Sequence, residues 1–74
     1  MSSVAEAVRE QLMAHNEQYQ NLCKEHTHYA IELEKLTTKT YLSEQEQLEE
    51  IRLKKLKLWA KDQMVMLVHH AQTH

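Results

Sequence analysis

The chain has 74 residues, enough for one small domain, 1–74, that buries only a modest share of its surface when it folds alone. It contains no glycine and no proline, which excludes most tight turns and glycine-rich phosphate loops, and its dominant residues, such as Leu, Glu, Lys and Gln, favour an all-α fold. The formal charge of −2, from nine basic and eleven acidic residues, provides no strong overall attraction for nucleic acid or an anionic membrane.

The first predicted helix covers residues 4–37. Larger side chains recur along it in steps of three and four, which is the a/d pattern of a coiled-coil seam. The seam includes two histidines among apolar and aromatic residues. The a positions are Leu12, Tyr19, His26 and Leu33, and the d positions are Val8, His15, Leu22, Tyr29 and Leu36.

A link is predicted over residues 38–43. Thr37 and Thr38 are poor in helix interiors because branching at Cβ restricts their rotamers. Ser43 and Glu46 fit the Ser-x-x-Glu capping box of a new helix start. Because the link lacks glycine and proline, two forms stay open, a tight turn or one continuous bent helix.

The second predicted helix covers residues 44–71 and carries two apolar stripes. At 100° per residue, Ile51, Leu58 and Val65 gather nearly opposite the other stripe. One partner helix covers only one stripe, so the sequence predicts an antiparallel two-helix hairpin, coiled-coil-like, that self-associates into a helical bundle as a dimer or tetramer. An amphipathic helix of another protein is the alternative cover. The other stripe consists of Leu53, Leu56, Ala60, Met64, Leu67 and Ala71.

The predicted interface follows the stripe around Leu58. If two copies of this helix cross antiparallel with Leu58 near the two-fold axis, Ile51 meets the partner's Val65 and Lys55 meets the partner's Asp62. The alternative is that both charged residues are solvated at the edge of the seam, where ion pairs contribute little. Trp59 fits either an interface anchor or a rim position. The predicted interface residues are Leu48, Ile51, Lys55, Leu58, Trp59, Asp62 and Val65.

Two motifs carry a family resemblance: H-N-x-x-Y-x-x-L-x-x-x-H over residues 15–26, and L-K-K-x-K-L-x-A-K-D over residues 53–62. Together they resemble the YdcH-like family of short bacterial proteins of unknown function, and the resemblance covers nearly the whole chain. It implies a helical hairpin that tends to self-associate, and no established activity. The chain departs from the family pattern at Glu17, where proline is common, at Ala60, where leucine is usual, and in a link without glycine or proline.

Cysteine and histidine positions give only a weak indication of a metal site. Cys23 and His26 are three residues apart, a spacing that can place two ligands on one metal ion, and His15 is expected near His69 at the open end of the hairpin. A structural zinc site needs four ligands, more than either pair supplies. We therefore expect no metal and no other cofactor.

His26 has two interpretations. At an a position it fits a neutral, hydrogen-bonded imidazole in the interior. It also fits a pH-sensing group, with Lys57, Lys61 or Asp62 of the second helix as its neighbours.

No catalytic constellation is evident, so we do not expect an enzyme. The carboxylates are spaced along solvated helix faces, and a glycine-free two-helix shape has no evident pocket. Ser43 is explained as a helix cap. The sequence predicts a small non-catalytic helical protein, a protein–protein interaction or oligomerisation module.

Nucleic-acid binding is the alternative function. Five basic residues lie within ten positions of the second helix, and counterion release favours such clusters. They do not share one face, however: Lys54, Lys57 and Lys61 form one group, while Arg52 and Lys55 point elsewhere. We therefore do not expect nucleic acid to be the main partner.

The expected location is a reducing bacterial cytoplasm. The single cysteine, Cys23, forms no internal disulfide, and the N-terminal residues 1–10 lack the apolar core of a signal peptide. The longest apolar run, residues 64–68, is far shorter than the ~20 residues that cross a bilayer, so no membrane association is expected.

Overall fold

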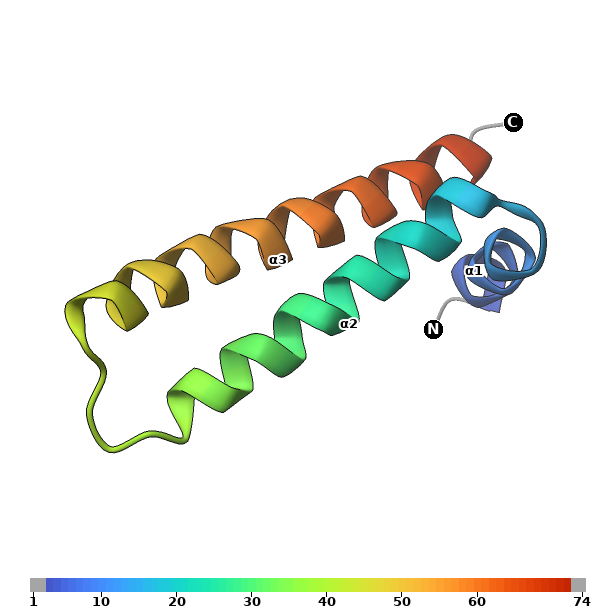
Figure 1. Cartoon of the computed structure of the whole chain (residues 1–74). Coiled ribbons are helices and arrows are strands. Elements are labelled where there is room, and N and C mark those ends of the chain that lie inside the picture. Colours follow the sequence, from blue (N-terminus) through green and yellow to red (C-terminus); the bar gives the residue numbers. More distant parts are fainter. Residues whose placement is uncertain (1–2, 73–74) are drawn as a thin grey trace.

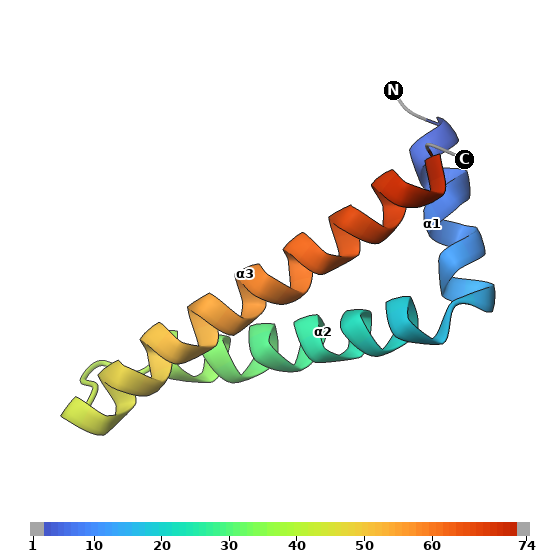
Figure 2. The same ribbon diagram turned by 90° about the horizontal axis from the view of Figure 1, so that it is seen from above.

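The computed structural model describes residues 3–72, and this part of the chain consists of helices and short connections. The helices are α1 (Ser3–His15), α2 (Glu17–Thr37) and α3 (Glu44–Gln72) (Figure 1). The α2 and α3 helices run antiparallel beside each other, and α1 lies across the end of the pair where α2 begins and α3 ends (Figures 1 and 2). The all-α prediction is confirmed. The molecule is elongated, with dimensions of 47 × 19 × 19 Å.

The chain breaks its first helix at Asn16, so the prediction of one continuous helix over 4–37 is wrong. Asn16 has an extended backbone, with φ −110° and ψ 109°, and its Oδ1 accepts a hydrogen bond of 2.8 Å from the backbone N–H of Tyr19. Asparagine is favoured at this N-cap because its oxygen satisfies an N–H that has no partner within the helix. The N–H of Asn16 donates to Leu12 O at 2.8 Å, which closes the last turn of α1. The two predicted helices are therefore three.

Two threonines take part in ending α2. Thr37 Oγ1 donates a hydrogen bond to Glu34 O, and Thr38 Oγ1 donates one to Lys35 O, both at 3.0 Å. These carbonyls belong to the last turn of the helix, where few N–H groups follow, and Glu34 O also accepts the backbone N–H of Thr38 at 3.1 Å. Residues 38–43 are not helical, so the chain turns here and does not continue as one bent helix.

The predicted capping box is confirmed at the start of α3. The N–H of Ser43 donates to Glu46 Oε1 at 3.0 Å, and the N–H of Glu46 donates to Ser43 Oγ at 3.1 Å. Lys39, which lies in the link, forms an ion pair with the same Glu46 carboxylate. The α3 helix then runs from Glu44 to Gln72, compared with the predicted 44–71.

The core lies between α2 and α3 and is small. The buried hydrophobic side chains among the described residues are Tyr19 and Leu22 of α2 and Leu53 and Ala60 of α3. The later seam positions of α2, from His26 to Leu36, are half-buried. Leu56, Met64 and Leu67, which lie on the same stripe of α3 as Leu53 and Ala60, are half-buried too. His15, which the prediction placed in the seam, is exposed at the end of α1 because the helix ends there.

Candidate interaction surface

The face of α3 that points away from the core is apolar and uncovered in a single chain. We call this surface the outer face. At 100° per residue, Leu58 lies on the side opposite the buried Ala60, and residues seven positions away from Leu58 fall on the same side. Four large apolar side chains are exposed along it by 50 to 68%. The outer face consists of Leu48, Ile51, Lys55, Leu58, Asp62 and Val65.

Two opposite charges interrupt the outer face. Lys55 and Asp62 are both exposed, and the ion pairs recorded between described residues include neither of them. They stand seven residues apart, about 10 Å along the helix axis, too far for a direct pair within one chain. Both charges therefore remain available to a second molecule or to solvent.

Trp59 lies at the edge of the outer face and is 49% exposed. Met66, seven residues further on and on the same side of α3, is 51% exposed. The two side chains widen the apolar surface on this flank. The sequence prediction missed Met66, although its seven-residue spacing from Trp59 is visible in the sequence.

The opposite flank of the outer face is basic. Lys54, Lys57 and Lys61 line a hollow of about 380 Å³ together with His26 of α2. Two of the neighbours predicted for His26, Lys57 and Lys61, lie there, whereas Asp62 is not part of its lining. Leu33 and Leu58 complete the lining.

Arg52 is separated from these lysines. Its guanidinium donates two hydrogen bonds to Glu49, of 2.8 and 2.6 Å, on α3 itself. This contact lowers the pKa of the Glu49 carboxyl and raises the pKa of Arg52. Its charge is therefore compensated locally, in contrast to the lysine group.

A second exposed apolar area lies on α1 and the outer side of α2. Met13 and Ile31 are exposed by 48 and 50%, and they line a wide hollow with Cys23 and Thr27. Gln20 Nε2 donates to Met13 O at 2.7 Å and joins the two helices beside it. This area is less continuous than the outer face, because polar side chains alternate with the apolar ones.

The four weak metal candidates do not come together. Cys23 lies on the outer side of α2, His26 lines the lysine hollow, His15 is exposed on α1, and His69 lies near the end of α3. Within residues 3–72, no group of three or more His, Cys, Asp or Glu side chains is arranged to hold a metal ion. Burial raises the pKa of the Cys23 thiol, against a hydrogen bond with Tyr19 that lowers it. A raised pKa disfavours the thiolate, the form that binds metals and attacks electrophiles.

Within the described residues, each helix is too short or too polar to span a lipid bilayer. Neither a protein-family model nor a curated protein nor a solved structure matches this chain. The arrangement of residues is therefore the basis for any functional conclusion.

Proposed function

We propose that this protein is a small non-catalytic interaction module that self-associates through the outer face of α3. The observation that carries the proposal is that Leu48, Ile51, Leu58 and Val65 are each at least half exposed, while the opposite face of the same helix packs against α2. Burial of apolar surface is favourable by ~25 cal/mol per Å². A helix with apolar residues on two opposite sides is stable when both sides are covered.

The pattern of residues supports an antiparallel pairing of two α3 helices. Ile51 and Val65 each stand seven residues from Leu58, so a two-fold axis near Leu58 places Ile51 against the partner's Val65. The same operation places Lys55 against the partner's Asp62, twice in the dimer. A parallel pairing would instead oppose like charges at both positions, which is unfavourable.

The family and the location are also part of the proposal. Membership of the YdcH-like family rests on the two sequence motifs, and it agrees with a self-associating helical protein without a known activity. A cytoplasmic location is supported by the single, reduced Cys23. A non-catalytic role is part of the proposal because the carboxylates are spread over helix surfaces and are not gathered at one site.

The size of the purified protein in solution tests self-association. Sedimentation equilibrium at micromolar concentrations should give a dimer or a larger species. Leu58→Ser should sediment as a single copy at concentrations where the parent chain is assembled. Ile31→Ser is the matched control, because Ile31 is an apolar residue of similar exposure on the other apolar area. If Ile31→Ser dissociates the protein and Leu58→Ser does not, the interface lies on α2.

The lysine hollow favours nucleic-acid binding as a second candidate function. Three lysines and His26 line it, and no carboxylate does so among the described residues. Binding of a short single-stranded DNA should then fall steeply as salt rises, because counterions are released. Lys57→Gln should weaken a mobility shift, whereas Arg52→Gln should not, since Arg52 is paired with Glu49. No shift at low salt would reject this candidate.

A further inference from the structure

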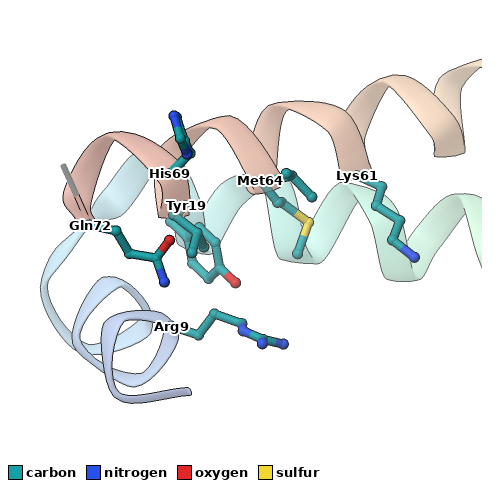
Figure 3. Close-up of a pocket in the computed structure, with 8 residues that line it drawn as sticks. Arg9, Tyr19, Lys61, Met64, His69 and Gln72 are labelled. Atoms are coloured by element: carbon teal, nitrogen blue, oxygen red, sulfur yellow. The ribbon is translucent and has the colours of Figure 1, made fainter. Parts of the chain in front are cut away.

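All three helices contribute to one pocket, at the end of the molecule where α1 crosses α3. The pocket has a volume of about 360 Å³, within the range of small-molecule sites in proteins. Arg9 comes from α1 and Tyr19 from α2, and the remaining lining side chains come from α3 (Figure 3). Those of α3 are Lys61, Met64, Val65, Val68, His69 and Gln72.

The inner part of the pocket is apolar. Its apolar lining comes from Met64, Val65 and Val68 of α3 and from the ring of Tyr19. Tyr19 is only 3% exposed, and burial raises the pKa of its phenol. The phenol therefore adds no negative charge to the pocket at physiological pH.

The mouth of the pocket is positively charged. Figure 3 shows the Arg9 guanidinium below the Tyr19 hydroxyl, and the Lys61 side chain on the other side of Met64. Arg9 Nε donates weakly to Ala5 O at 3.4 Å within α1. Neither Arg9 nor Lys61 takes part in the ion pairs recorded between described residues, and no Asp or Glu of that part of the chain lines the pocket.

We propose that this pocket binds a small amphipathic carboxylate, with its head group at the positively charged mouth that Arg9 and Lys61 line and its apolar tail along Met64 and Val68. The arginine fork matches the two oxygens of a carboxylate. A metal cation is disfavoured by the two positive charges. Of the two rings that line the pocket, Tyr19 is buried and His69 is exposed, so successive bases of a nucleic acid strand have no row of exposed rings on which to stack.

The site does not depend on self-association, although the two surfaces adjoin. Val65 belongs both to the outer face and to the pocket wall. The head-group residues Arg9 and Lys61 lie outside the outer face. Ligand binding should therefore persist in Leu58→Ser, so a failure of one proposal is distinguishable from a failure of the other.

Titration with octanoate, followed by NMR, tests the site. Saturable shifts are expected at Arg9, Tyr19, Met64 and Val68. Octanol and acetate are the controls, since one lacks the charge and the other lacks the tail, and both should bind more weakly. Binding that is not saturable, octanol binding as strong as that of octanoate, or shifts confined to residues 48–58 would each overturn the proposal.

Two substitutions test the contribution of the charged residues at the mouth. Arg9→Gln and Lys61→Gln should each weaken octanoate binding, by about fivefold for the loss of one exposed charge pair of ~1 kcal/mol. Both residues are exposed, so the fold should persist, as circular dichroism can check. Lys24→Gln, on the other side of α2, is the matched control and should leave binding unchanged. Equal loss in all three variants would mean that only net charge matters, which contradicts a defined site.

Discussion

Ala60 and Leu58 stand two residues apart on α3, and Ala60 has no exposed surface whereas Leu58 is 61% exposed. Two residues correspond to a rotation of about 200° around the helix. The chain has therefore placed apolar side chains on two opposite sides of one helix and covers only one of them. The proposed self-association follows from this relationship.

Charge exchange tests the orientation of the pairing. Lys55→Asp should weaken the dimer by about five- to thirtyfold, because two symmetric contacts each lose an attraction and gain a repulsion, together ~1–2 kcal/mol. The double variant Lys55→Asp with Asp62→Lys should restore the parental dissociation constant, as measured by sedimentation. An unrescued double variant would show that the two residues do not meet across the interface.

The core between α2 and α3 is small, so one truncation should be costly. Leu53 is 3% exposed, and Leu53→Ala should lower the free energy of unfolding by about 2–5 kcal/mol through lost burial and the cavity left behind. Urea denaturation at one fixed protein concentration measures this change, since assembly also contributes to apparent stability. Ile31→Ala, a truncation at a half-exposed position, should cost much less.

Asn16 caps the N-terminus of α2. Asn16→Ala removes the Oδ1 that accepts the N–H of Tyr19 and should lower the free energy of unfolding by about 1 kcal/mol. Asn16→Asp keeps an accepting oxygen and should remain close to the parent in thermal melts. Equal stability of the alanine and aspartate variants would show that the cap contributes little.

The capping box predicts a specific acid dependence. The bond from Lys39, followed by that from the Ser43 backbone, lowers the pKa of the Glu46 carboxyl below its usual 4.5. A lowered pKa in the folded state means that this stability is present in full above pH 4.5 and is lost as the pH falls through the folded-state pKa. Glu46→Gln should therefore reduce the melting temperature at pH 7, and the difference from the parent should shrink toward pH 3.

A second variant identifies the partner responsible. Lys39→Gln removes the main cause of the lowered pKa and should shift the acid part of the profile toward that of Glu46→Gln. Parallel pH profiles for the parent and Glu46→Gln would contradict this account of the cap.

Much of the fold could be predicted because its signals are local. The capping box at Ser43 and the three- and four-residue steps from Tyr19 onward each depend on residues within one or two turns. The break at Asn16 was not predicted because the a/d spacing continues through Leu12 and His15. That spacing indicated one continuous helix, although asparagine is a favoured N-cap residue. A spacing pattern cannot distinguish one helix from two helices that meet at a cap.

One of the two candidate sites, the outer face, could be predicted from the sequence, and the other, the pocket, could not. The outer face follows from the angular positions of residues along one helix, so the sequence was sufficient to identify it. The pocket requires Arg9 to lie beside Tyr19 and Lys61, and this depends on how α1 folds back across α3. With α1 expected in line with α2, Arg9 was not a candidate for any site.

Disulfide trapping shows whether a second copy covers the outer face. In a Cys23→Ser background, Leu58→Cys lies near the two-fold axis and should form a covalent dimer under mild oxidation. Ile51→Cys alone should not, because its two copies are about 21 Å apart along the paired helices. A mixture of Ile51→Cys and Val65→Cys chains should link.

On a non-reducing gel, position 58 should link to itself and position 51 should link to position 65. Neither position 58 nor position 51 should link to position 31. If the Leu58→Cys chain stays monomeric under conditions that link Ile31→Cys chains to each other, then the outer face is not covered by a second copy.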